Sequence, residues 1–278
     1  MPAHTIDDLP GYRRRLRVTP SGGRVLAELE DDYHCMAVTI HHDGHAATAV
    51  HPVMERAPWS ICPGAVAVLE QTFVGIALEN FATRGDKRAN CTHLHDLAVL
   101  AAAHAFDNAP TVFDILVSDP IDGRSAAELR RNDTTVLDWV LVKGRITAPA
   151  LLAGVDLDNM RDWIESLDPE TREAAKLLRW GTMVAHGRTL PADWASSGSG
   201  NMASRSRCFT FQPHKAGSAK HVGAIRDFSR GTARPLEARP LEARPLEQRS
   251  ASAAARDSDL FHVTRDHASR SFAGRRTP

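Results

Sequence analysis

Apolar and polar residues alternate through the first part of the chain, which is the pattern of β-strands with one buried face. The alternating runs are 12–18, 24–29, 33–41 and 46–53. Asp43 and Gly44 separate the last two runs, and Asp-Gly is a strong hairpin signal. These residues predict an antiparallel β-meander.

Farther along the chain, the spacing of apolar residues changes to that of helices. Residues 65–78, just after Pro63, and residues 92–106 place apolar side chains three and four positions apart. Residues 156–185 do the same, and Pro169 divides them into two helices.

More strands are predicted in the second half. The β-rich runs are 111–118, 126–131, 135–142, 208–211 and 221–225. The second and third of these form a hairpin about Asn132 and Asp133, and the last two are expected to close the sheet. Residues 195–206, rich in Ser and Gly, are expected to be a loop. The predicted fold class is α+β, with an antiparallel β-meander packed against helices.

Composition, charge and the lengths of the apolar runs exclude several classes of protein. Hydrophobic residues make up 42% of the chain and charged residues 24%, and the net charge is zero, so nothing indicates nucleic-acid binding. No apolar run reaches the roughly 18 residues of a membrane span, and the N-terminus lacks the pattern of a signal peptide. Four cysteines are too few for a secreted disulfide scaffold. We therefore expect a cytoplasmic protein without a membrane partner.

The chain is expected to have three parts. Residues 1–10 are expected to be flexible, and 11–229 to form the globular α+β domain. Residues 230–278 repeat Ala-Arg-Pro-Leu-Glu three times, at 233–247, and contain few aromatic residues. Such a segment buries too little apolar surface to offset chain entropy, so the tail is predicted to be disordered, with protein binding as an alternative role.

Two cysteines are predicted to lie at the starts of two helices. Cys62 precedes the helix at 65–78, and Cys91 precedes the helix at 92–106 with His93 two residues on. If the helices meet there, two sulfurs and one imidazole nitrogen form a site that suits zinc or iron. Cys35 lies inside a predicted strand and is interpreted as a small core residue.

Two other interpretations stay open. Cys62 is a candidate catalytic nucleophile or persulfide carrier, with His93 as its base, because a helix start lowers the pKa of a thiol. Alternatively, the cysteines only pack in the core of a non-catalytic binding module, and the tail recruits a partner.

Several short motifs resemble a bacterial family of unknown function, the one numbered 2889. They are 32–35, 38–44, 58–65 (with Cys62-Pro-Gly-Ala), 90–94 (Asn-Cys91-Thr-His-Leu) and 208–213 (Cys208-Phe-Thr-Phe-Gln-Pro). The resemblance implies no activity.

The order of elements in 33–106 is also similar to that of NifU-like iron–sulfur cluster scaffolds. Cys62 and Cys91 match the first and last cluster cysteines of that fold, so the resemblance implies a NifU-like core and an iron–sulfur cofactor. No cysteine lies in 80–90, where the scaffold has its middle cysteine, and Gly64 stands where the scaffold has an acidic residue.

Overall fold

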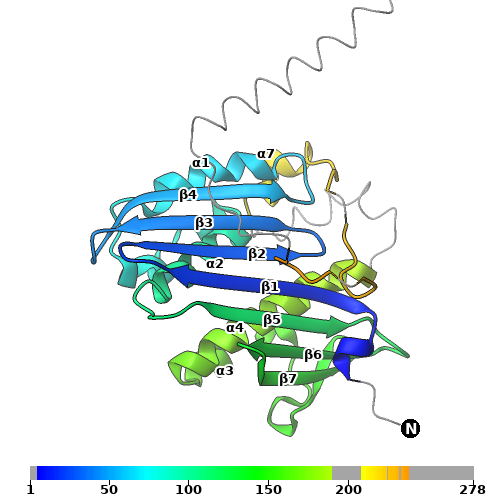
Figure 1. Cartoon of the computed structure of the whole chain (residues 1–278). Helices are drawn as coiled ribbons and strands as arrows, with labels where there is room; N and C mark the ends of the chain where they lie inside the picture. The colour runs from blue at the N-terminus through cyan, green and yellow to red at the C-terminus, as the bar shows by residue number, and fades with distance from the viewer. Residues whose placement is uncertain (1–4, 190–207, 224, 232, 238–278) are drawn as a thin grey trace, which may run out of the picture. The chain divides into compact units, whose positions relative to one another are not determined.

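An antiparallel sheet of eight strands organises the protein (Figure 1). The computed structural model describes residues 5–189, 208–223, 225–231 and 233–237. The strand order is β4-β3-β2-β1-β5-β6-β7-β8. The strands are β1 (Gly11–Pro20), β2 (Arg24–Asp31), β3 (Cys35–His42), β4 (Ala47–Arg56), β5 (Thr111–Ser118), β6 (Arg124–Arg131), β7 (Thr134–Val142) and β8 (Arg145–Ala148).

Strands β1–β4 and β5–β8 are two meanders that meet where β1 pairs with β5. Leu16 lies opposite Phe113, and Gly11 lies opposite Ser118 at the end of the pairing. A side chain at Gly11 would collide with the backbone carbonyl of Val117, so the close approach of the two strands requires glycine there.

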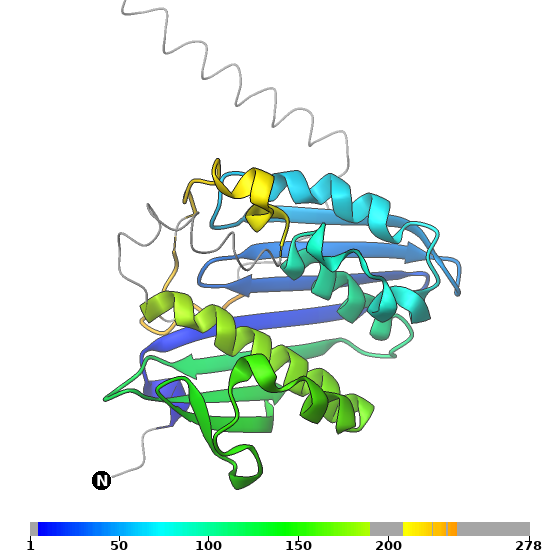
Figure 2. The same ribbon diagram turned by 180° about the vertical axis from the view of Figure 1, so that it is seen from behind.

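Helices cover one face of the sheet (Figure 2). Helices α1 (Ala65–Phe73) and α2 (Thr92–Ala103) pack on the β1–β4 half, and α4 (Pro169–Ala185), preceded by α3 (Arg161–Ser166), packs on the β5–β8 half. A short helix, α7 (Pro213–Ala216), follows later in the chain. The largest core cluster lies between the helices and the sheet and includes Leu16, Leu29, Met36, Leu94 and Phe113.

The opposite face of the sheet carries ion pairs. Arg15 pairs with Asp114, Arg17 with Glu28, Arg56 with Glu30 and Arg130 with Glu128. Because side chains alternate along a strand, basic and acidic residues of neighbouring strands meet on this face. We call it the open face, since none of the described helices α1–α4 packs on it.

The sequence pattern predicted most of this architecture. The four strands of the first meander, the 132–133 hairpin and the division of 156–185 at Pro169 are confirmed. On β3, Met36 faces the helices while Cys35 and Ala37 face the open side, as the alternation predicts. None of the described helices is long and apolar enough to cross a membrane.

Two predicted strands are wrong. Phe209–Phe211 is a turn of 3-10 helix, and His221 makes only an isolated bridge to Trp59. Aromatic residues favour strands, but Phe211 instead packs edge-on against Trp59 at a centroid distance of 5.4 Å, in a small cluster outside the sheet. The predicted loop at 195–206 lies outside the described residues.

The described residues pack beyond both ends of the predicted domain at 11–229. Ile6–Asp8 is a 3-10 turn with Ile6 buried, and the Arg13 guanidinium donates to the carbonyl oxygens of Ile6 at 2.9 Å and Leu9 at 2.7 Å. At the other end, packing extends past 229, because Leu236 is only 5% exposed. Residues 1–4 and 238–278 lie outside the described residues.

Candidate functional site

The start of α2 is held between two other parts of the chain. The amide of Asn90 donates to the hydroxyl of Thr72 on α1 at 2.9 Å, and the backbone carbonyl of Asn90 accepts from the N–H of Phe209 at 2.8 Å. Cys91, the N-cap residue of α2, is therefore fixed beside both α1 and the 208–211 segment.

Three of the four cysteines meet at this point. Cys62, in the 3-10 turn Cys62–Gly64, has its sulfur 3.1 Å from the hydroxyl of Thr210. Cys208 packs against the same apolar cluster as Cys62, and Cys62 and Cys208 are both close enough to raise the pKa of Cys91. We call Cys62, Cys91 and Cys208 the cysteine cluster.

Backbone N–H groups lower the pKa of two thiols in the cysteine cluster. The N–H groups of His93 and Leu94 face Cys91, and those of Thr210 and Phe211 face Cys208. Both cysteines thus receive donors from the residues two and three positions later. Hydrogen bonds of this kind favour a thiolate over a thiol.

Burial nevertheless keeps these thiols protonated. It raises the pKa of Cys91 to about 12, against the lowering effect of its backbone donors. Burial also raises the pKa of Cys62, although the Thr210 hydroxyl opposes it, and that of Cys208. The prediction that the helix start lowers the pKa of Cys62 was therefore wrong, because the loss of solvation outweighs the donors.

His93 packs against aromatic rings rather than against the cysteines. Its ring stacks on that of His34 with a centroid distance of 3.8 Å and an interplanar angle of 28°, and Trp180 lies 4.7 Å away. Within the described ranges, Asp31, His34 and His93 form the one group of three or more potential ligands whose atoms all lie within 4.8 Å of one another. The predicted three-ligand site of Cys62, Cys91 and His93 is therefore not assembled in this structure.

Asp31 is the centre of that second group, which we call the Asp31 cluster. Its Oδ1 accepts from the N–H groups of Tyr33 and His34, both at 2.7 Å, and lies 3.0 Å from Nδ1 of His34. Its Oδ2 accepts from the hydroxyl of Tyr12 at 2.6 Å and from Nη2 of Arg14 at 2.6 Å. Burial alone would raise the pKa of Asp31, but the charges of His34 and Arg14 hold it well below its usual range.

A metal ion does not fit the Asp31 cluster as it stands. The carboxylate already accepts on both oxygens, and Arg14 places a positive charge against it. Burial and the charges of His34 and Arg14 hold the pKa of His93 well below its usual range, so this ring stays neutral.

The sequence carried a signal for part of the Asp31 cluster. Asp31 and His34 are three residues apart, so a short turn lets the carboxylate reach the imidazole. Arg14 lies directly opposite Asp31 in the β1–β2 pairing. Cys208 carried no local signal, since only the fold brings it to Cys62 and Cys91.

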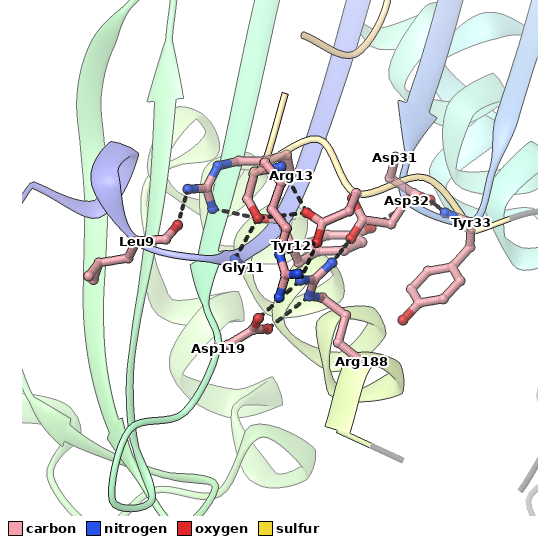
Figure 3. Close-up of polar contacts among 12 residues, drawn as sticks. Leu9, Gly11, Tyr12, Arg13, Asp31, Asp32, Tyr33, Asp119 and Arg188 are labelled. Atoms are coloured by element: carbon pink, nitrogen blue, oxygen red, sulfur yellow. Dashed lines mark hydrogen bonds and ion pairs between the residues drawn. The ribbon is translucent and has the colours of Figure 1, made fainter. Parts of the chain in front are cut away.

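An ion-pair network ties the end of α4 to the sheet and to the later chain (Figure 3). Arg188, in the 3-10 turn His186–Thr189, binds Asp32 at 2.5 Å, Asp119 at 2.8 Å and Asp227 at 3.3 Å. Burial raises the pKa of Asp32 to about 7, although Arg188 opposes that rise. Through Asp227, the network holds the segment that leads to the first Ala-Arg-Pro-Leu-Glu repeat at 233–237.

Fold and site together define an α+β protein with three free thiols near a helix start, two of them buried and one partly buried. No protein-family model matches the chain, and no curated protein matches it either. The two resemblances noted in the sequence therefore stay predictions.

Proposed function

We propose that the protein binds a transition metal, either zinc or iron (including a small iron–sulfur cluster), through Cys62, Cys91 and Cys208. One observation carries the proposal: three of the four cysteines, from distant parts of the chain, lie near the start of α2, where the Cys62 sulfur is 3.1 Å from the Thr210 hydroxyl and the N–H of Phe209 donates to the carbonyl of Asn90. In this proposal Cys208 replaces His93 as the third ligand.

The chemistry of the thiols supports this choice. Burial keeps them protonated in the absence of a cation, so metal binding displaces protons and supplies the missing positive charge. The backbone donors then stabilise the resulting thiolates. Three soft sulfur ligands favour zinc, copper(I) or iron–sulfur chemistry over magnesium or calcium.

The sulfurs must draw closer to hold one ion. Zinc–sulfur bonds of about 2.3 Å place tetrahedral ligands about 3.8 Å apart, whereas the three sulfurs are not among the described groups within 4.8 Å. Rotation of the cysteine side chains is the expected adjustment. Three protein ligands leave a fourth position for water or substrate, as in catalytic zinc sites.

The alternative that Cys62 acts as a nucleophile has less support. A nucleophilic cysteine needs an accessible thiolate, and Cys62 is buried, with its pKa raised by that burial. A cytoplasmic location belongs to the proposal as well, because unpaired thiols persist in a reducing compartment.

Metal analysis of the full chain tests the proposal. We would purify it anaerobically and compare the wild type with Cys62→Ser, Cys91→Ser, Cys208→Ser and, as a matched control, Cys35→Ser. Cys35 is buried on the open face, away from the cluster. We expect zinc or iron in the wild type and in Cys35→Ser, with loss in each of the other three variants.

A second set of variants separates this site from the Asp31 cluster, whose ligand-type atoms do lie within 4.8 Å. His34→Asn and His93→Asn should keep the metal if the cysteines hold it. Metal lost in these two but kept in the cysteine variants would move the site to the Asp31 cluster. The proposal would be overturned if the wild type remained metal-free after reconstitution with zinc and with iron.

A further inference from the structure

A cavity lies beside Trp59, where β2 ends, β3 begins and β4 ends. Its volume is about 580 Å³, which is within the range of pockets that bind small molecules. Its apolar lining comes from distant parts of the chain and includes Met54 of β4, Trp59 in the link to α1, Val222 and Leu236. We call it the Trp59 cavity.

A bulge in β4 turns consecutive residues toward this cavity. Across the β3–β4 pairing, Arg56 lies opposite Cys35 and Met54 lies opposite Met36, so Glu55 has no opposite residue. A regular strand alternates its side chains between two faces, but Met54, Glu55 and Arg56 all line the cavity. Bulges occur often beside active sites, where they redirect side chains in this way.

Two charged side chains at the cavity lack a full set of partners. Glu55 is exposed, and its carboxylate makes no hydrogen bond or ion pair within the described residues. Arg226 is 60% exposed, and of its guanidinium nitrogens only Nη1 has a partner in the described part of the chain, Oε1 of Glu30 at 3.1 Å. The cavity therefore offers one free carboxylate and the remaining N–H groups of one guanidinium.

The other two charges that line the cavity are already satisfied. Glu30 accepts from Arg56 and Arg226 on Oε1, and from the N–H of Leu236 on Oε2. Arg56 also donates to the carbonyl oxygens of Asp31 and Asp32, at 2.8 and 2.7 Å. A charged ligand would therefore find its partners in Glu55 and Arg226.

All four charges lie around one cysteine. Burial raises the pKa of Cys35, a lining residue, to about 12. The charges of Glu30 and Glu55 add to this rise. The charges of Arg56 and Arg226 oppose it. The free carboxylate and the free guanidinium groups thus belong to the same end of the cavity.

Leu236 closes one side of the cavity in a strained conformation. It packs on Leu26, Cys35 and Ala37, away from the main core. Its φ of 60° lies in the left-handed region, which a bulky side chain seldom adopts. The N–H of Leu236 donates to Oε2 of Glu30 at 2.8 Å, and this bond holds the wall in place. Strained residues of this kind cluster at ligand sites.

We propose that the Trp59 cavity binds a free α-amino acid with a large apolar side chain. Arg226 pairs with the carboxylate of the ligand, Glu55 pairs with its ammonium group, and its side chain packs against Trp59 and Leu236. A ligand with a single charge would leave one of the two free groups unpaired, whereas a zwitterion pairs both. This site is separate from the proposed metal site, because Cys35 does not belong to the cysteine cluster.

Calorimetric titration of the full chain tests the proposal. The probes are L-phenylalanine, L-leucine and L-methionine, together with 2-phenylethylamine, which lacks the carboxylate, and 3-phenylpropionate, which lacks the ammonium group. L-Phenylalanine should bind about fivefold or more tightly than either analogue, the factor expected for one partly exposed ion pair. The proposal is overturned if none of the three amino acids binds at about 10 mM, or if either analogue binds as tightly as L-phenylalanine.

Two variants assign the charged partners. Glu55→Gln should weaken binding of L-phenylalanine about fivefold and leave 3-phenylpropionate unchanged. Arg226→Gln should weaken L-phenylalanine to the same degree and leave 2-phenylethylamine unchanged. Glu79→Gln removes another exposed acid, outside the cavity, and should bind as the wild type. Wild-type affinity in both Glu55→Gln and Arg226→Gln would overturn the proposal.

A matched pair of substitutions tests the location. Val222 lines the cavity and is 61% exposed, so Val222→Trp should fill the space without disturbing the core and weaken L-phenylalanine binding about tenfold or more. Ile225 is 58% exposed but does not line the cavity, so Ile225→Trp should bind as the wild type. Equal affinity in Val222→Trp and the wild type would place the ligand elsewhere and overturn the proposal.

Discussion

The cysteine cluster and the Asp31 cluster both take a residue from the start of α2, Cys91 and His93, but they treat polar groups in opposite ways. In the Asp31 cluster both oxygens of the carboxylate are paired, since it accepts from a tyrosine, an arginine, a histidine and two backbone N–H groups. In the cysteine cluster the donors face neutral sulfurs. Paired buried charges make the Asp31 cluster a source of stability, and the metal-binding proposal concerns the cysteine cluster alone.

The largest expected effect comes from breaking the balanced cluster. Arg14→Ala removes a fully buried charged partner of the Asp31 carboxylate, and removal of one member of a buried ion pair costs about 3–5 kcal/mol of unfolding free energy. Urea unfolding of the wild type and the variant measures this loss.

Arg15→Ala is the matched control for that measurement. Arg15 neighbours Arg14 on β1 but pairs with Asp114 on the open face, where both side chains are partly exposed. Such a pair contributes about 1 kcal/mol or less. Equal losses in the two variants would contradict the view that the Asp31 cluster is a main source of stability.

A smaller effect on the unfolding free energy is expected from zinc binding to the cysteine cluster. A ligand present at 100 times its dissociation constant stabilises a protein by about 2.7 kcal/mol. Zinc at that excess should therefore raise the unfolding free energy of the metal-free wild type and leave that of Cys91→Ser unchanged. Thermal unfolding with and without zinc measures the difference. Equal stabilisation of both proteins would place the bound zinc elsewhere.

The smallest expected effect concerns His104, a buried histidine with acidic partners, in contrast to His93, which is held neutral. His104 is buried, which alone would lower its pKa, but hydrogen bonds and charges from Glu173 and Asp107 raise it. A histidine with a raised pKa stabilises the fold fully below about pH 6.5, and this contribution disappears as the pH rises through the raised pKa.

His104→Gln should therefore cost on the order of 1 kcal/mol at pH 6, and the cost should shrink at pH 9. Urea unfolding of wild type and variant at both pH values checks this sign. A cost that grows with pH would mean that the ring is held neutral, as His93 is.

Much of the fold could be predicted because its signals are local. Alternation at 33–41 identified both the strand and its two faces, and the Asn132–Asp133 turn identified a hairpin. The 208–211 run failed because strand preference is weak without a neighbouring strand to pair with. The expected grouping of Cys62, Cys91 and His93 is not found, because His93 packs against His34 while Cys62 and Cys91 lie in another cluster.

By itself, the sequence determined seven of the eight strands, the main helices and the position of Cys62 and Cys91 near helix starts, because periodicity and proline act over a few residues. Tertiary structure alone decided which side chains share a site. It brought Cys208 to Cys91, turned His93 toward His34, and gave Leu236 an apolar surface that the composition of its own segment does not reveal. The physical reason is that burial and long-range contacts decide the partners of a side chain, and the neighbouring residues in the sequence determine neither of them.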